Sequence, residues 1–326
     1  MIQNQTLIFV FFQAKLLVTT GDTTIWEDTG VISEVIDLQD PTMQCEPLPD
    51  FPIQTSQGAG ILMNQLPIIC AGIFSQGCFT LGQNDPISNL LTQRSYTAGL
   101  KLDEFTFWVT GGHTLREGSF IYEKLSSTEL VSLNEETRLG PELPIHVWGH
   151  CIAALDENSV ILAGGVSNEH YSSSVTYIYN RLTGEWSEGP SMTIDRYLHQ
   201  CASFKSEAHE GRNVVVAAGG YSIINGMMSS AEIFDAMNPE QGWVPIADLP
   251  RELAEFSMIT SPNGNGVIAS GGISGRDRQG SIYELKCSES GCEAWTELEQ
   301  KIQNPRMNHV AMLIPDILTT CNSISK

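Results

Sequence analysis

The sequence is poor in basic residues. It has 17 lysines and arginines against 38 aspartates and glutamates, for a formal net charge of -21, and no segment concentrates the basic residues. Affinity for DNA and RNA comes mainly from neutralising backbone phosphates, so this composition argues against nucleic-acid binding. The acidic balance favours solubility, and an acidic surface matched to a basic partner is the alternative interpretation.

Long apolar runs and several chemical motifs are missing as well. No stretch reaches the roughly 20 apolar residues that a membrane-spanning helix needs, so no membrane span is expected. The sequence has no Gly-x-Ser-x-Gly motif, no phosphate-binding loop and no Cys-x-x-Cys pair. These motifs mark serine hydrolases, nucleotide sites and zinc sites, so we expect no metal and no cofactor.

What the sequence does contain is a repeated apolar run that ends in a glycine pair. It is clearest at 213–220, and it returns about every 50 residues, which indicates an array of one structural unit. Each run predicts a buried strand that stops where the backbone needs a conformation that glycine adopts cheaply. The repeat glycines are Gly72, Gly111, Gly112, Gly164, Gly165, Gly219, Gly220, Gly271 and Gly272.

Each unit reads as four antiparallel strands. In the clearest unit, strands are expected at 150–155, 159–165, 174–180 and 185–190, and such a unit makes one blade of a β-propeller. A tryptophan follows the glycine pair at a near-constant distance in three units. We expect it to pack between its own blade and the next, with its indole N–H bonded to a partner. These residues are Trp186, Trp243 and Trp295.

The predicted fold is all-β: a six-bladed propeller closed by the C-terminal strand. Residues 306–314 repeat the start of a unit and are expected to complete blade 1, because closure removes exposed strand edges. We expect a weak signal peptide or N-terminal extension at 1–15, the propeller at 16–315 and a tail at 316–326. The expected blades are 16–50 with 306–314 (blade 1), 57–93 (blade 2), 94–145 (blade 3), 146–192 (blade 4), 196–247 (blade 5) and 252–298 (blade 6).

The glycine doublets, the aromatic residue of the third strand and the spaced tryptophan resemble the kelch-repeat family. Kelch domains are six- or seven-bladed propellers that mostly bind other proteins. This chain looks like a stand-alone form without the BTB and BACK regions, similar to kelch-like proteins of invertebrates. The resemblance implies a non-enzymatic, monomeric scaffold that presents loops to a partner protein, the long loop at 113–125 first among them.

The alternative function is an enzyme. Sialic acid epimerases are kelch propellers, so a carbohydrate- or anion-processing enzyme acting at the channel mouth is the second hypothesis. Galactose oxidase shares the architecture but needs two histidine copper ligands and a Cys–Tyr crosslink. The seven histidines here show no metal-ligand spacing.

Four basic side chains stand at equivalent places before the first strands: Arg94, His146, Arg196 and Arg306, with Arg251 one residue off register. One interpretation is a positive ring at the channel mouth that holds a carboxylate or phosphate. The favoured one is structural, with the arginines bonded to loop carbonyls between blades. His199 and His309 are expected to be polar core groups.

Eight cysteines allow full pairing. Two local disulfides are predicted, Cys70 with Cys78 and Cys287 with Cys292, while Cys151 and Cys201 are expected to be free, buried thiols. The apolar run at 7–12 is either a truncated or weak secretory signal, or an extra strand or a gene-model artefact. A secreted location is slightly favoured over a cytoplasmic one.

Overall fold

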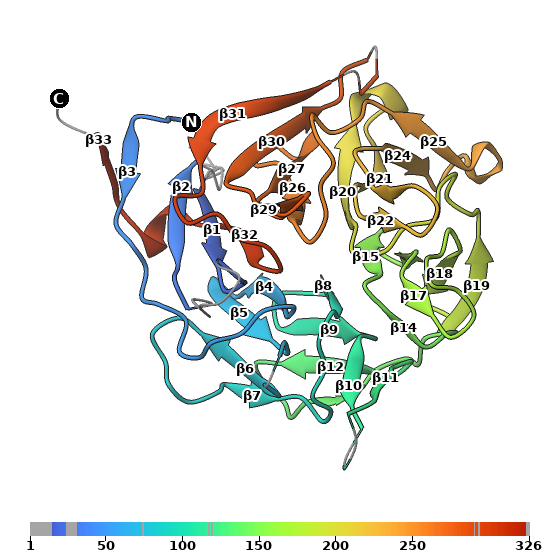
Figure 1. Cartoon of the computed structure of the whole chain (residues 1–326), viewed down its shortest axis with the longest axis horizontal. Coiled ribbons are helices and arrows are strands. Elements are labelled where there is room, and N and C mark those ends of the chain that lie inside the picture. Colours follow the sequence, from blue (N-terminus) through green and yellow to red (C-terminus); the bar gives the residue numbers. More distant parts are fainter. Residues whose placement is uncertain are drawn as a thin grey trace, which may run out of the picture.

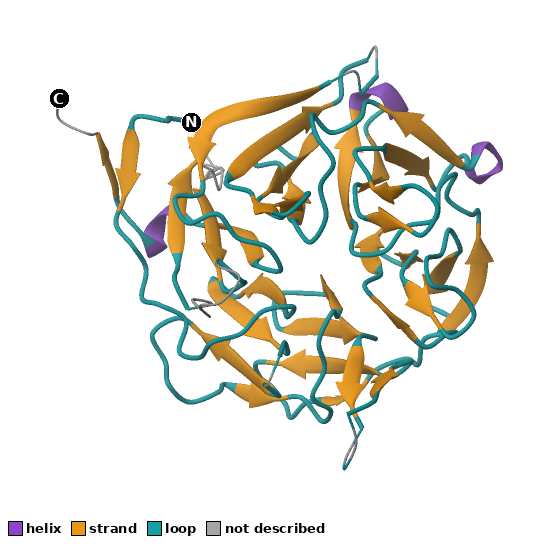
Figure 2. Cartoon of the chain, viewed as in Figure 1, coloured by secondary structure: helices purple, strands orange, loops and turns teal. Residues whose placement is uncertain are grey.

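Six β-sheets are arranged around a central channel (Figure 1). The structure, a computed structural model, describes residues 15–23, 31–73, 75–116, 118, 120–289, 291–292 and 294–323. Strands dominate, and the helices of the described part are three short 3-10 turns (Figure 2). None of these helices has the length and apolar composition to cross a membrane. The predicted six-bladed propeller is confirmed, and the possible signal peptide lies outside the described residues, which begin at Lys15.

Blades 2 to 6 are four-stranded antiparallel sheets, with the first strand of each nearest the channel. Blade 2 contains β4 (Ala59–Met63), β5 (Leu66–Cys70), β6 (Gly77–Thr80) and β7 (Ser88–Asn89); blade 3 contains β8 (Ala98–Lys101), β9 (Thr106–Thr110), β12 (Thr128–Ser132) and β13 (Arg138–Leu139). Blade 4 contains β15 (Cys151–Ala154), β16 (Ser159–Ala163), β18 (Thr176–Asn180) and β19 (Glu185–Gly189). Blade 5 contains β20 (Gln200–Ser206), β21 (Arg212–Ala218), β24 (Ala231–Asp235) and β25 (Trp243–Ile246); blade 6 contains β26 (Ser257–Thr260), β27 (Gly266–Ser270), β30 (Ser281–Lys286) and β31 (Trp295–Lys301).

Both ends of the chain build blade 1. Its sheet runs β2 (Glu34–Asp37), β1 (Lys15–Thr19) and β32 (Val310–Ile314), so the C-terminal strand is innermost, as predicted. The tail adds a second closure that the sequence did not indicate. β33 (Cys321–Ser323) pairs with β3 (Met43–Cys45), and a disulfide joins Cys45 to Cys321.

The glycine pairs let neighbouring blades approach closely. Gly164 and Gly165 have φ of +64° and +95°, a region that side chains disfavour. A Cβ at Gly164 would lie 2.7 Å from the ring of His199 in the next blade. A Cβ at Gly165 would lie 2.6 Å from Val147 of its own blade. The doublets are therefore packing positions that hold blade to blade.

The three tryptophans pack against the preceding blade, so the predicted contact with the next blade is corrected. Trp295 donates its indole N–H to the carbonyl oxygen of Ala247, just after β25, at 2.9 Å. The predicted partner is wrong for Trp186 and Trp243, whose buried indole N–H groups form no hydrogen bond with the described residues. Trp243 lies in a cluster with Met192 of blade 4 and stacks on Phe234, and Trp186 lies 6.1 Å from Trp108 of blade 3. The spacing of the tryptophans could not predict which of the two adjacent blades they contact, because the repeat period does not give the orientation of the outer strand.

All eight cysteines are paired. The two local disulfides have the predicted partners. The expectation of free thiols at Cys151 and Cys201 is wrong: these residues lie on β15 and β20, inner strands of adjacent blades, with Cα atoms 5.7 Å apart. That separation suits a disulfide, and only the closed ring brings the two strands together.

Candidate functional site

The three arginines expected at the channel mouth lie inside their blades instead. Arg94 donates Nη2–H to Glu129 Oε1 at 2.6 Å and Nη1–H to the carbonyl oxygens of Gly111 and Ser127. Arg196 pairs in the same way with Glu232, and Arg306 with Glu34. All three side chains are fully buried, so they cannot form the proposed anion-binding ring. Their carbonyl bonds stay within one blade, which also corrects the expected bonds between blades.

His146 and Arg251 do not occupy the arginine position at all. His146 is exposed and lies within 3.5 Å of the Ser126 hydroxyl, while Arg251 donates to Gln279 Oε1 at 2.6 Å. The equivalent residues are the buried Val147 and Leu253. The register is fixed by a residue with positive φ that stands two positions later in every blade.

These positive-φ residues form a closed ring of hydrogen bonds around the channel. Each backbone N–H donates to the carbonyl oxygen of the ring residue in the adjacent blade, at 2.8 to 3.1 Å. The φ values lie between +53° and +63°, a conformation that costs a non-glycine residue on the order of 1 kcal/mol. The six bonds offset that cost and fix the ring. Its members, called the αL ring below, are Gln57, Tyr96, Gly149, Leu198, Glu255 and Asn308.

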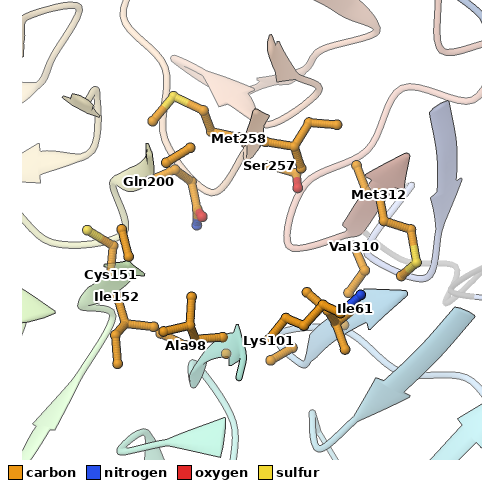
Figure 3. Close-up of a pocket in the computed structure, with 18 of the residues that line it drawn as sticks. Ile61, Ala98, Lys101, Cys151, Ile152, Gln200, Ser257, Met258, Val310 and Met312 are labelled. Carbon is orange, nitrogen blue, oxygen red and sulfur yellow. The ribbon is translucent and has the colours of Figure 1, made fainter. Parts of the chain in front are cut away.

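The channel widens beyond the αL ring into a cavity of about 500 Å³. Its wall is the six inner strands, and apolar side chains such as Ile61, Ile152 and Met312 dominate it, with Lys101 and Gln200 among the polar ones (Figure 3). None of the three buried arginines lines it. The cavity is therefore not the basic site that the sequence suggested.

Three histidines flank the αL ring as buried, neutral groups. Burial lowers the pKa of His150 and His309 to about 3, and it lowers the pKa of His199 well below its usual value; the nearby arginine charges act in the same direction. His150 Nε2 lies 2.9 Å from the Thr110 hydroxyl. A histidine with so low a pKa is a weak general base at neutral pH, so the role of a core group fits these residues best.

One face of the propeller lies on the side of the αL ring that is opposite to the 500 Å³ cavity. There the connection between the second and third strands of a blade folds back onto the segment that leads into its first strand. Ser95 bridges to His113 and Tyr197 to Tyr221 in this way, and β14 (Val147–Trp148) pairs with β17 (Val166–Ser167). We call this surface the loop face.

An unbroken series of aromatic rings crosses the loop face over blades 3 to 5. Ring centroids of successive members lie 4.6 to 5.9 Å apart, within the range of favourable aromatic contacts. The series begins on the hairpin of β10 (His113–Leu115) and β11 (Tyr122–Lys124) and ends on that of β22 (Tyr221–Ser222) and β23 (Gly226–Met227). Its members, the aromatic arc, are Tyr122, His113, Tyr96, Trp148, Tyr197 and Tyr221.

Glu255 of the αL ring stands beside this arc. It accepts a hydrogen bond from Nδ2 of Asn308, and burial raises the pKa of its carboxyl group. Burial, then the Glu255 charge, raises the pKa of Tyr221 to about 12 and also raises that of Tyr197. The same two causes lead the upward shift at Tyr96. The phenols are thus protonated at neutral pH, and the charge of Glu255 acts on all three of them.

Exposed apolar side chains flank the arc. Of the fourteen large hydrophobic side chains that are exposed among the described residues, seven lie on three hairpin connections of the loop face, in the adjacent blades 3, 4 and 5. Phe120 is 98% exposed and Ile224 is 84% exposed. The seven are Leu115, Phe120, Ile121, Tyr122, Tyr171, Ile223 and Ile224. The predicted binding loop at 113–125 supplies four of them, whereas sequence reasoning missed the aromatic arc and Glu255.

Three comparisons with known proteins agree with this architecture. Residues 153–193 match the family model of the Kelch motif. Kelch-like protein 41b of Danio rerio is 26% identical over 159 residues, which make up 49% of this chain but only 23% of that protein. The solved structure of YjhT superposes with a TM-score of 0.60 over 84% of this chain and 99% of that chain, at 13% identity, which is a likeness of fold.

The closed ring of six sheets defines the class: this is a six-bladed β-propeller. Together with the glycine doublets, the Kelch motif at residues 153–193 and the kelch-like relative support a propeller of the kelch-repeat type. Among the residues that the structure describes, no group of three or more histidine, cysteine or acidic side chains is arranged to hold a metal ion.

Proposed function

We propose that this propeller is a non-enzymatic protein-binding scaffold whose partner docks on the loop face. The observation that carries the proposal is the joint placement of the aromatic arc and the exposed apolar hairpins on one face, over three adjacent blades. Contiguous exposed apolar surface marks interaction sites, and tyrosine and tryptophan dominate binding energy at interfaces. The kelch-like relative supports the same class of role.

The frame suits this role because it is rigid. The αL ring, the disulfide between blades 4 and 5 and the double closure of blade 1 fix the positions from which the hairpins project. The scaffold acts as a monomer. Four disulfides persist best in an oxidising compartment, which supports the secreted location over the cytoplasmic one.

A matched pair of surface variants tests the docking face. Phe120→Asp combined with Ile224→Asp places charge on two exposed loop-face tips, while Leu182→Asp places one aspartate on an exposed turn between β18 and β19. Wild type and variants are used as bait in the native source, and captured proteins are quantified by mass spectrometry. The partner should be retained by wild type and Leu182→Asp and lost by the double variant.

The outcome that contradicts this function is equal capture by all three baits, or loss with Leu182→Asp alone. Circular dichroism and the unfolding midpoint of each bait show whether the fold is intact. All changed residues are exposed, so we expect the free energy of unfolding of each variant to stay within about 0.5 kcal/mol of wild type, as for other surface substitutions.

An enzyme acting on a carbohydrate or an anion at the channel mouth is the second candidate. One observation favours it: Glu255 is a half-buried carboxyl group with a pKa raised by burial, a property of catalytic acids. An anionic substrate would, however, approach two carboxylates, because Asp22 also faces this place. Incubation with N-acetylneuraminic acid, followed by NMR, tests the candidate; anomer or epimer exchange that Glu255→Gln abolishes would establish it.

A further inference from the structure

Glu255 has two charged neighbours at the centre of the loop face. The ionisable groups that act on Glu255 are Asp22 and Arg278, besides the phenols of the aromatic arc. Arg278 Nε donates to the carbonyl oxygen of Asp22 at 2.8 Å, and Asn308 Nδ2 reaches Asp22 Oδ2 at 3.4 Å. Asn308 Nδ2 donates a hydrogen bond to Glu255, and among the described residues Glu255 forms no salt bridge, so its carboxyl group can accept a cationic donor from a partner.

The space beside Glu255 is small. The cavity at the αL ring measures about 60 Å³ and is lined by Tyr96, Glu255 and Asn308 among others. This is room for a few water molecules or for the head group of one side chain, since small-molecule sites measure about 300–1,000 Å³. A ligand must therefore present a compact group at the end of a narrow stem.

Aromatic rings and carboxylates favour the same kind of group. The faces of tyrosine and tryptophan rings attract cations, and a desolvated carboxylate forms its strongest hydrogen bonds with a guanidinium or ammonium group. The net charge of -21 would add long-range attraction for a basic partner.

We propose that the Glu255 pocket of the loop face receives an arginine or lysine side chain of the partner, with the head group bonded to Glu255 and the stem lying along Tyr96, Trp148 and Tyr197. The inference rests on the proposed docking role of this face and specifies its partner: a protein with a basic residue at the centre of its contact surface.

A pair of small probes tests the pocket directly. N-acetylarginine amide carries the cation, and N-acetylcitrulline amide has nearly the same shape without the charge. Binding is followed by NMR at the indole N–H of Trp148, assigned with the Trp148→Phe variant. The arginine probe should shift this signal saturably, and the citrulline probe should not.

Two isosteric variants locate the charge that matters. Glu255→Gln should weaken the arginine probe about tenfold or more, since a charge-assisted hydrogen bond is lost. Glutamine is compatible with the αL ring because Gln57 occupies the same place in blade 2. Glu252→Gln makes the same change at an exposed residue of the same segment and should bind like wild type.

Equal binding of both probes, equal affinity in both variants, or preference of the face for an acidic peptide or a neutral sugar would overturn the proposal. Failure of the cation pocket can be distinguished from failure of the docking role by the capture experiment. If Phe120→Asp with Ile224→Asp still abolishes partner capture, the loop face binds protein without a cation pocket. If that variant captures the partner as wild type does, the docking role fails as well.

Discussion

Blades 1, 3 and 5 differ from blades 2, 4 and 6 at two facing positions of the blade interior. The odd blades bury an arginine before the first strand and a glutamate on the third strand, whereas the even blades place an aliphatic residue or threonine opposite an aromatic ring. The third-strand residue pairs with equivalent second-strand positions in all six sheets. The odd pairs are Arg306 with Glu34, Arg94 with Glu129 and Arg196 with Glu232. The residues at the same two positions of the even blades are Thr55 and Phe79, Val147 and Tyr177, and Leu253 and Tyr283, and the last two pairs share an apolar cluster.

This alternation teaches that the arginine position belongs to the frame. One backbone accommodates an ion pair or an apolar pair at the same place, as expected if a well-packed apolar pair can replace a buried salt bridge at little cost. Repetition of a charged residue along the sequence was therefore a signal of architecture. The side chains with a candidate function, the aromatic arc and Glu255, differ in residue type from blade to blade. They lie on the αL ring, on the segments that lead into the first strands and on the hairpins of the loop face.

The largest expected effect comes from breaking one ion pair. Glu232→Ala leaves the Arg196 guanidinium buried without its counter-charge and removes the acceptor of the Thr193 N–H. The free energy of unfolding should fall by about 3–5 kcal/mol. Chemical denaturation measures it, and a loss below about 1 kcal/mol would mean that the pair is not an interior contact.

A cavity in an even blade should cost somewhat less. Leu253→Ala removes a fully buried side chain that packs in the cluster of Tyr283, and the expected loss is about 3 kcal/mol. The same denaturation series compares the two blades. If Leu253→Ala destabilises the protein by several kcal/mol more than Glu232→Ala, the ion pair of blade 5 and the apolar pair of blade 6 do not contribute equally to stability.

Low pH should destabilise the fold through the buried histidines of three blades, whereas blade 6, which has Phe256 at the same position, should not contribute to this effect. His309 has a folded-state pKa of about 3, lowered by burial, against 6.5 in the unfolded chain. The unfolded state therefore binds more protons below pH 6.5, and stability is lost as the pH falls from 6.5 toward 3.

A substitution patterned on blade 6 tests this cause. Between pH 7 and pH 5 the free energy of unfolding of His309→Phe should fall by about 1–2 kcal/mol less than that of wild type, as measured by denaturation at both pH values. His170→Phe, at an exposed position, is the control and should follow wild type. Parallel curves for all three proteins would show that the histidine is not responsible.

The smallest effect is expected when the ion pair of an odd blade is replaced by the apolar pair of an even blade. Arg196→Leu with Glu232→Tyr gives blade 5 the pair found in blade 6, and the unfolding free energy should stay within about 1 kcal/mol of wild type. The N–H of the exposed Thr193 then bonds to water. A double variant as unstable as Glu232→Ala would show that the odd and even blades are not interchangeable.

Local and periodic features could be predicted from the sequence. The glycine doublets indicated the blades, the unit start at 306–314 indicated β32, and short spacing indicated two disulfides. Long-range partners could not be predicted. Cys151 meets Cys201 only because two blades adjoin, and Cys45 meets Cys321 only because the tail pairs with β3.

The candidate site was harder to predict than the fold. The sequence alignment of the repeats was wrong by one residue in blade 4: it placed His146 at the arginine position, which Val147 occupies in the structure. This error made four basic residues look like a ring at the channel mouth. Members of the aromatic arc do stand at repeated positions, since His113 and Tyr221 each follow a glycine pair and Trp148 and Tyr197 each precede an αL-ring residue. Other residue types fill these positions in the remaining blades, so the glycine period alone did not reveal the arc. The exposed tips at 113–125 were found because a long loop is visible in the sequence.

Partner capture by the Arg196→Leu, Glu232→Tyr propeller, side by side with Glu255→Gln, tests most directly whether the arginines are frame and the loop face is the site. The account predicts that the exchanged blade captures the wild-type partner in full, while Glu255→Gln captures about a tenth as much or less. A folded exchange variant that loses the partner, with Glu255→Gln keeping it, would contradict the account.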